Sequence, residues 1–483
     1  FFVSYDEFES AQTEDFTDND EQNDIAPGFW DELNSIVVSS LGYDPGGRPD
    51  VANTPVTSER TLAKLDWNMS DPHRAAITHP RSEEFSTTAS TTSSGSAWYA
   101  VPAALQANTL QLNSDWSDSL STEIRVNIKD WERGQICRGG TGIGHIEIEN
   151  LEVADVVGTP LDGFILAGDD VPDLVGGCDR FRHANEYNDE RTQILAKADY
   201  FRGDHVITAG VEFEDFSLFN LFVPQARGRF QYDNYADLVA GIADVNYQNV
   251  PSNNSQDAAA SWGFERWTFF VQDVIQLTPD LEIGFGARFE TFDQSDAPTF
   301  VQNVQDTYGI DSTSNLDGKD LFLPRVSFRW NMSDRTTLTG GLGKFSGGDP
   351  KVWISNSFNL PSVFTSNFAV GDFGGYVTDA TSVPQPLLDD VATSTPVPTD
   401  VIDPKFEIPS DWKASLRLEH DLDLGRLGDG YVLTAQYLYT KTVDGFLWQN
   451  LAQTSRSDTT PGVAPDGRPI YADLDDLGID NLT

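Results

Sequence analysis

Apolar and polar residues alternate over many segments of this chain, and this period of two constrains its fold more than any other feature. The segment 325–332 reads RVSFRWNM, with apolar residues at even positions and polar or charged residues at odd ones. The same alternation occurs in the segments 63–69, 123–129, 207–213, 281–290, 412–422 and 431–439. Successive side chains of a strand point to opposite faces, so each segment is predicted to be a β-strand. The apolar positions of these segments carry no Lys, Arg, Asp or Glu, which predicts that one face of the sheet meets an apolar environment.

The lengths of the connections indicate what covers the apolar face. Tight turns near residues 70, 117, 203, 279, 333 and 427 alternate with long connections at about 9–58, 80–107, 133–190, 218–263, 293–320 and 346–409. A soluble β-sandwich would mix connection lengths at both ends, whereas outer-membrane barrels have short periplasmic turns and long extracellular loops. One strand at 1–8 and two strands for each of six hairpins give about 13 strands. We therefore predict an all-β fold, part of an antiparallel transmembrane β-barrel, whose longer strands project beyond the membrane.

The charge and the motifs of the chain exclude several functions. It has 31 Lys and Arg against 76 Asp and Glu, a formal net charge of −45, and nucleic-acid binding needs a basic surface. The sequence contains no His-Glu-x-x-His, Walker or Gly-x-Ser-x-Gly motif, so we expect no enzyme and no catalytic or cofactor-binding residues. The acidic loops permit one metal hypothesis, that their carboxylates bind Ca²⁺, which prefers oxygen ligands. The alternative is an acidic loop surface that only faces water.

Two cysteines, Cys137 and Cys178, bracket a stretch of about forty residues rich in Gly and Asp. This spacing favours one disulfide within a loop, formed in an oxidising compartment. Two free thiols in a reducing compartment are the alternative.

Tryptophans precede several of the predicted turns. The pentapeptide WNMSD occurs at 67–71 and again at 330–334, and each copy ends an alternating segment. Trp67, Trp116 and Trp330 lie on the apolar parity just before a turn, where the aromatic girdle of a barrel meets the lipid headgroups. The alternative is that they are core tryptophans of a sandwich.

The opposite parity is expected to face the barrel lumen. Its charged residues in the alternating segments are Lys64, Asp66, Arg125, Lys129, Glu212, Arg288, Arg325, Arg329 and Arg417. For most of these positions we expect charges that are solvated or paired with one another.

Several hairpins resemble those of a known family. The stretch 267–290, WTFFVQDVIQLTPDLEIGFGARFE, is similar to a hairpin of TonB-dependent outer-membrane receptors, in particular their Oar-like branch. The stretches PRVSFRWNMSDRTTLTGGLGKFSGG (324–348) and HVITAGVEFEDF (205–216) resemble other hairpins of that family, and FFVSYDEFE (1–9) resembles the strand that begins its barrel.

The resemblance implies a receptor of the Gram-negative outer membrane. Such receptors bind a substrate through extracellular loops and move it through a plugged barrel, using energy from a TonB-type inner-membrane protein. Family members carry an N-terminal plug, an energy-coupling box and about 22 strands, and neither plug nor box is visible in residues 1–483. We therefore expect the chain to be the central part of a receptor barrel, with lipid, a TonB-type protein and an unknown solute as partners. The solute could be a small molecule, an oligosaccharide or a polypeptide.

An alternative function belongs to another class. A secreted or surface adhesin made of acidic β-sandwiches would show the same alternation of residues, but it would be folded in plain buffer. A passive porin is disfavoured because the hairpins resemble those of plugged receptors.

Overall fold

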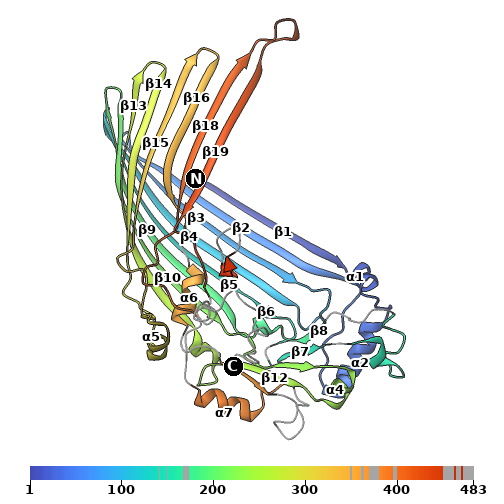
Figure 1. The fold of residues 1–483 in the computed structure, drawn as a ribbon. Coiled ribbons are helices and arrows are strands. Elements are labelled where there is room, and N and C mark those ends of the chain that lie inside the picture. Colours follow the sequence, from blue (N-terminus) through green and yellow to red (C-terminus); the bar gives the residue numbers. More distant parts are fainter. Residues whose placement is uncertain are drawn as a thin grey trace.

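One curved antiparallel sheet makes up most of the protein (Figure 1). The structure, a computed structural model, describes residues 1–140, 142–149, 151–166, 173–348, 351–359, 364–368, 380–394, 400–449, 462–463 and 469–470. The sheet has 14 strands in this described part, 13 of which follow one another in chain order, while the short β6 (Ile136–Cys137) pairs with the fourth. These 13 strands are β1 (Phe2–Asp15), β2 (Val51–Ser70), β3 (His73–Thr88), β4 (Tyr99–Ser117), β5 (Leu120–Gly134), β9 (Asn185–Arg202), β10 (His205–Phe222), β13 (Ala260–Thr278), β14 (Leu281–Asp293), β15 (Asp320–Ser333), β16 (Thr336–Ser346), β18 (Ser410–Leu422) and β19 (Tyr431–Val443). The prediction of an antiparallel sheet of about 13 strands is confirmed.

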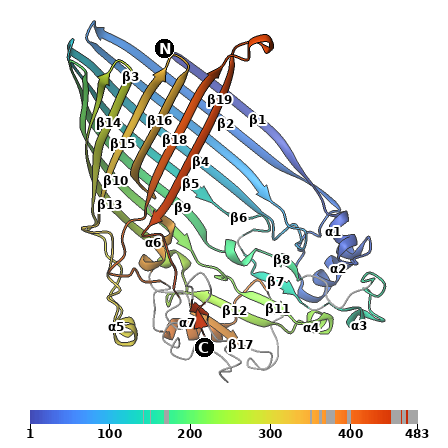
Figure 2. The same cartoon turned by 45° about the horizontal axis from the view of Figure 1, so that its top comes forward.

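The sheet is open in the described part, with β1 at one edge and β19 at the other. Figure 2 shows the strands running side by side between one end with short turns and one end with long connections. No helix among the described residues is long and apolar enough to cross a membrane.

Five two-residue turns hold the short-turn end together. They join β2 to β3, β4 to β5, β9 to β10, β13 to β14 and β15 to β16. In each turn the second residue accepts a backbone hydrogen bond from the next strand along the sheet. The donor and acceptor pairs are Asp115 N–H to Pro72 O, Phe201 N–H to Ser119 O, Gln276 N–H to Asp204 O, Asn331 N–H to Asp280 O and Asp421 N–H to Arg335 O, at 2.8–2.9 Å. Neighbouring hairpins are therefore linked to one another through their turns.

The repeated pentapeptide WNMSD builds the same hairpin end twice. In the first copy the strand register shifts by one residue between Asn68 and Ser70, and in the second copy it shifts between Asn331 and Ser333. The methionine of each copy thus lies at a β-bulge, which increases the local twist next to the turn. The repeat encodes a strand end, a bulge and a turn.

The two faces of the sheet differ as the alternation predicts. We call the face that carries Trp67 the apolar face and the face that carries Asp66 the polar face. The strand register brings apolar residues of seven neighbouring strands into one row on the apolar face: Leu65, Ile77, Leu110, Val126, Ile194, Phe213 and Trp267. Leu65 and Ile77 are each 52% exposed, which a sandwich core would not allow, whereas a lipid-facing surface requires it.

Strands continue beyond this apolar band, and the predicted bounds of the long connections are therefore too wide. The connection expected at 80–107 is wrong over most of its length, because β3 ends at Thr88 and β4 begins at Tyr99. Arg81 and Glu83 occupy apolar-face positions there and still pair in the ladder with β4. The backbone keeps its hydrogen bonds where the face meets water, so the strand persists although the alternation has ended.

The long connections fold into a second structure, which we call the outer unit. It contains a five-stranded sheet in the order β17 (Phe364–Phe368), β12 (Asp244–Asn249), β11 (Arg229–Tyr232), β7 (His145–Ile148) and β8 (Leu174–Gly177). Four helices pack on the same core: α2 (Phe29–Leu41), α3 (Val153–Val156), α4 (Tyr235–Ala240) and α7 (Gln385–Thr393). These elements come from four different connections, so the outer unit joins loops that are far apart in the sequence.

Candidate functional site

A ladder of hydrogen-bonded side chains crosses the polar face near the middle of the strands. Thr109, Asn127, Gln193, Glu214 and Arg266 are direct neighbours on five adjacent strands. Four hydrogen bonds of 2.9, 3.4, 2.6 and 3.0 Å connect them in this order. Only 1% of Glu214 is exposed, and a buried carboxylate with two such donors is held in one position. The wall at this level is therefore polar and rigid.

A second group of charges lies beside this ladder. The Arg288 guanidinium contacts the Glu212 carboxylate at 3.3 Å and the Glu290 carboxylate at 2.5 Å. The Lys129 ammonium lies 3.8 Å from the buried carboxylate of Asp189. Polar-face charges at this level are thus mostly compensated.

One segment of the longest connection folds onto this wall. Helix α6 (Lys351–Phe358) places the Lys351 ammonium 3.5 Å from Asp189 and 5.0 Å from the ring centre of Phe216. The Trp262 indole N–H donates to the Ser355 hydroxyl at 3.0 Å, and its ring stacks on Phe358. Burial lowers the pKa of Lys351. The α6 contacts are both apolar and charged, and they narrow the space in front of the polar face.

A group of aromatic side chains lies at the long-loop end of the sheet, and part of it is exposed to solvent. We call Trp353, Phe406, Phe446 and Trp448 the mouth cluster. The ring centres of Trp353 and Trp448 are 4.5 Å apart, and Phe446 lies 5.0 Å from Trp353 and 5.7 Å from Phe406. Trp353 is 52% exposed. Exposed rings fixed by one another offer flat apolar surfaces with polar edges, which suit a ligand that carries rings or other apolar parts.

The outer unit is tied to the main sheet by a disulfide. Cys137 and Cys178 are joined, with their Cα atoms 5.4 Å apart. Cys137 belongs to β6, which pairs with β4, while Cys178 directly follows β8 of the five-stranded sheet. The Arg227 guanidinium lies 3.6 Å from the Cys178 sulfur and donates to the His183 carbonyl at 2.8 Å. The bond therefore crosses from one sheet to the other within a packed environment.

A buried histidine next to this disulfide is held in its neutral form. The Nδ1 atom of His183 accepts a hydrogen bond from the Arg227 backbone N–H, and its Nε2 lies 3.0 Å from the Cys178 carbonyl. Burial lowers the pKa of His183 to about 3. A second proton on the ring would point from Nδ1 at the Arg227 N–H, so the imidazole acts here as a structural link.

One group of acidic residues in the outer unit has the spacing of a metal site. Among the described residues, the carboxylate oxygens of Glu147, Glu149 and Asp173 lie within 4.8 Å of one another. Burial would raise the pKa of Glu147, but hydrogen bonds to His145 and Arg229 and the positive charge of Arg229 lower it to about 2.

Cationic partners therefore already compensate Glu147. The Nδ1 atom of His145 accepts from the Arg180 N–H, which leaves the proton of the neutral ring on Nε2, 3.6 Å from Glu147. This donor set fits Ca²⁺ poorly, because a protonated nitrogen points at the carboxylate that would bind the metal. Calcium binding by the acidic loops stays a prediction.

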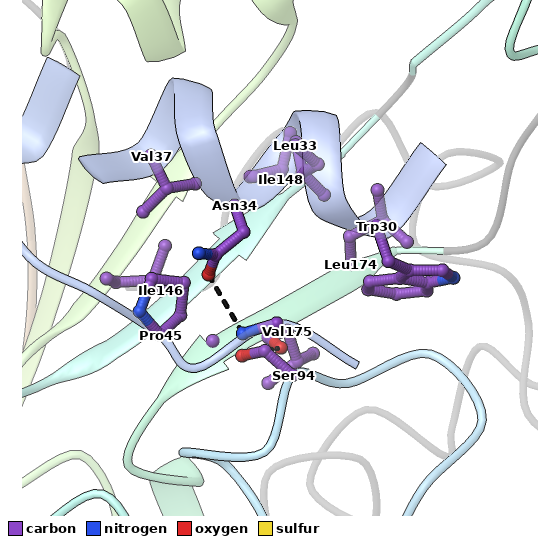
Figure 3. Close-up of a pocket in the computed structure, with 12 residues that line it drawn as sticks. Trp30, Leu33, Asn34, Val37, Pro45, Ser94, Ile146, Ile148, Leu174 and Val175 are labelled. Atoms are coloured by element: carbon purple, nitrogen blue, oxygen red, sulfur yellow. Dashed lines mark hydrogen bonds between the residues drawn. The ribbon is translucent and has the colours of Figure 1, made fainter. Parts of the chain in front are cut away.

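A small apolar cavity lies between α2 and the five-stranded sheet (Figure 3). Its wall consists mainly of Trp30, Leu33, Val37, Ile146, Ile148 and Leu174. The Asn34 side-chain oxygen accepts from the Gly47 N–H at 2.9 Å at its edge. With a volume of ≈ 20 Å³ it has room for about one water molecule, so it is a gap in the core of the outer unit rather than a ligand site.

The structure places the residues singled out in the sequence on two surfaces. Trp67, Trp116 and Trp330 lie on the apolar face close to two-residue turns, and all three are exposed. Their contact with lipid headgroups stays a prediction. The nine charged residues expected in the lumen all lie on the polar face according to the strand register: Lys64, Asp66, Arg125, Lys129, Glu212, Arg288, Arg325, Arg329 and Arg417.

Most of these nine are paired within the wall. Lys64 contacts Asp66 at 2.9 Å, and Arg417 contacts Glu419 at 2.7 Å. Arg125 pairs with Glu123. The mutual pairing that was expected for most positions is thus present, and Arg325 and Arg329 are exceptions among the described residues.

The most constrained residues of the wall were not found in the sequence. Asp189, Glu214 and Arg266 continue the polar parity of their strands. The alternation would have identified Asp189 if its strand had been predicted to begin before residue 190, and Glu214 if its strand had been predicted to end after residue 213. Lys351 and the mouth cluster carry no such signal, because they lie in irregular segments or in a short helix.

Comparison with known proteins agrees with this architecture. A family model described as an outer membrane beta barrel domain matches residues 45–478. No curated protein matches the chain. Solved structures with a similar fold include the outer membrane transporter YddB from Escherichia coli (TM-score 0.49, 11% identity, covering 91% of this chain and 44% of that one). Another is the siderophore receptor PirA from Pseudomonas aeruginosa (TM-score 0.44, 11% identity, covering 87% of this chain and 52% of that one). A third is the ferric yersiniabactin uptake receptor FyuA from Yersinia pestis (TM-score 0.40, 9% identity, covering 81% of this chain and 46% of that one).

The chain spans about half the length of these solved structures. The family match covers most of the chain and coincides with the sheet that has an exposed apolar face. The chain therefore belongs to the family of outer membrane β-barrel domains, which places it in the Gram-negative outer membrane.

Proposed function

We propose that the chain is part of a TonB-dependent receptor of the Oar-like branch, which captures a solute at its long-loop end and moves it along the polar face. In this proposal the long connections lie outside the cell and the short turns face the periplasm. A plug fills the barrel, and an inner-membrane energy-transducing protein displaces it. Binding is followed by gated passage, without covalent chemistry.

One observation carries the proposal: α6 and the mouth cluster bring a ligand surface and a charged wall together at the long-loop end. The Lys351 contact to Asp189 fixes α6 on the polar face, and Trp353 of the same helix contributes to the exposed mouth cluster. A solute bound at the rings would thus lie at the entrance of the polar passage. The fold of the solved receptors named above is compatible with this arrangement.

We further propose that the chain is the central part of a longer barrel. The open edges of β1 and β19 leave backbone N–H and C=O groups without a ladder partner in the described sheet. Hydrocarbon cannot satisfy such groups, so a sheet with a lipid-facing side needs further strands to close it. The coverage of about half of each solved receptor supports the same view.

An uptake experiment in the native host tests the proposal. The depletion of solutes from a defined mixture of small molecules, oligosaccharides and peptides would be compared among the wild type, a strain lacking the receptor and a strain lacking the energy-transducing protein. We expect at least one solute whose depletion needs both proteins. Depletion that needs the receptor but not the energy-transducing protein would point to a passive pore and contradict the proposal.

Variants of the mouth cluster sharpen this experiment. Replacing Trp353 and Trp448 by Ala removes two of the exposed rings and should lower uptake at limiting solute concentration roughly tenfold or more. Leu447→Ala is the matched control, because this neighbouring side chain is exposed but is not part of the ring group. Equal uptake by the double variant and the control would show that the mouth cluster does not bind the solute.

A further inference from the structure

Arg325 and Arg329 are cations on the polar face that form no ion pair with another described residue, although Glu282 is the cross-strand neighbour of Arg329. Neither guanidinium makes a hydrogen bond or an ion pair within the described residues, and both residues are exposed. Acidic residues outnumber basic ones 76 to 31 in this chain, so an arginine without a carboxylate is unexpected. Other arginines of the same face, such as Arg288 and Arg417, are paired.

The residues around Arg325 explain why it has no partner. Gly286 and Gly343 are its direct neighbours on the adjacent strands. Ser327, two positions along β15, is flanked in the same way by Gly284 and Gly341. The remaining neighbours of Arg325 on this face are Leu323, Arg288 and Phe345, so no carboxylate lies beside it.

The glycines leave a hollow in front of the wall, which is lined by Arg325, Ser327, Phe345, Lys413, Leu438 and Thr440. It has a volume of ≈ 390 Å³ and is open to solvent. Strands β14, β15, β16, β18 and β19, which form it, lie side by side in Figure 2.

Close packing restricts two glycines of this wall to small side chains. A Cβ atom at Gly286 would come within 2.6 Å of the Val271 carbonyl oxygen, and one at Gly284 within 2.8 Å of the Ser327 hydroxyl. A side chain at Gly286 would therefore have to displace the neighbouring strand, whereas one at Gly284 would have to move the Ser327 side chain. The wall stays thin beside Arg325 because the position of Gly286 has no room for a side chain.

The chemistry of the hollow defines what it can bind. The Arg325 guanidinium offers a fork of N–H donors that matches a carboxylate. Lys413 lies two strands away and adds a second positive charge, although its ammonium is also 3.6 Å from the Asp411 carboxylate. Phe345 and Leu438 supply apolar surface next to these cations. The Lys413 ammonium lies 5.8 Å from the Phe345 ring centre, so charge and ring are presented together.

We propose that this hollow is a binding site for an organic acid, a small solute with a carboxylate group and an apolar body. The carboxylate binds Arg325, and the apolar body lies against the glycines and Phe345. The site lies on the polar face below the mouth cluster, so it would be a second station for a solute on its way through the barrel. This inference rests on the proposed function only in taking the polar face as the wall of the passage.

Chemical modification of the complete outer-membrane protein in detergent tests the proposal. Phenylglyoxal reacts with accessible arginines, and peptide mass mapping reports the reaction at Arg325 separately. We expect Arg325 to react in the absence of added anions, to be protected by benzoate and to remain unprotected by the neutral analogue benzamide. An Arg325 that is unreactive before benzoate is added would overturn the proposal, because an acidic group of the protein itself would then occupy the hollow.

Direct binding to variants provides the second arm. Isothermal titration calorimetry with benzoate should show binding that weakens about tenfold or more in Arg325→Gln. The matched control is Arg60→Gln, because Arg60 lies on the polar face of β2 but pairs with Glu84 at 2.8 Å. Equal weakening in both variants would show a general charge effect and overturn the site, as would binding of inorganic phosphate without binding of benzoate.

These measurements need no transport, so they separate the two proposals. Benzoate binding at Arg325 in a protein that shows no energy-dependent uptake would leave the site standing and remove the transport function. Energy-dependent uptake with no benzoate binding would do the reverse.

Discussion

The disulfide between Cys137 and Cys178 should contribute most of the local stability of the outer unit. It closes a loop with a sequence separation of 41 residues. In the chain-entropy model a cross-link of this length removes unfolded-state entropy worth about 4 kcal/mol at 25 °C. The two sulfurs also lie in the hydrophobic core, and Arg227 packs against one of them. The surrounding side chains are therefore already packed, and we expect no new contacts that would replace the lost stability.

Hydrogen exchange of the complete outer-membrane protein measures this contribution. In a variant with Cys137→Ala and Cys178→Ala, the amides of β7 and β8 should exchange up to roughly 10³-fold faster, which corresponds to about 4 kcal/mol. The reduced and alkylated wild type serves as a comparison that retains both Cβ and sulfur atoms. Amides of β13 and β14 in the main sheet are the internal control and should not change.

The reasoning would be refuted by unchanged exchange in β7 and β8. That result would mean that the packing of the outer unit, and not the cross-link, limits its opening.

Three further predictions concern pH, the wall and calcium. The outer unit should lose stability as the pH falls from about 6.5 towards 3, because the unfolded chain binds a proton at His183 that the folded chain excludes. Glu147 should extend this loss from about pH 4.5 towards 2, because its pKa is also lower in the folded chain than in the unfolded one. Exchange in β7 measured between pH 7 and 4 checks this, and a flat profile would contradict it. Glu214→Ala should lower the free energy of unfolding in urea by roughly 3–5 kcal/mol, because Arg191 and Arg266 both lose the buried carboxylate that they share, while Glu214→Gln should cost less. Equal stability of Glu214→Ala and wild type would disprove the role of the ladder. If acidic loops bind Ca²⁺, its titration in detergent should slow protease cleavage within 9–58 and 346–409, and cleavage rates that do not depend on calcium would rule this out.

The sequence by itself determined the sheet and its two faces. The alternation of residues such as Trp330 and Arg329 is a local property, because successive side chains of any strand point to opposite sides. The turns were predictable for the same reason, since Asp-Pro at 71–72 and Pro-Asp at 279–280 act within four residues. Disulfide formation was also suggested by the spacing of the two cysteines alone.

Only the tertiary structure decided where the long connections go and which charges meet. Lys351 contacts Asp189 across 162 residues of sequence, and Trp262 donates to Ser355 across 93. Neither contact has a periodic signal, because each depends on how an irregular segment packs against a distant strand. The unpaired state of Arg325 was hidden for a related reason: its neighbours Gly286 and Gly343 are set by the register between strands, and the register follows from the pairing of whole hairpins.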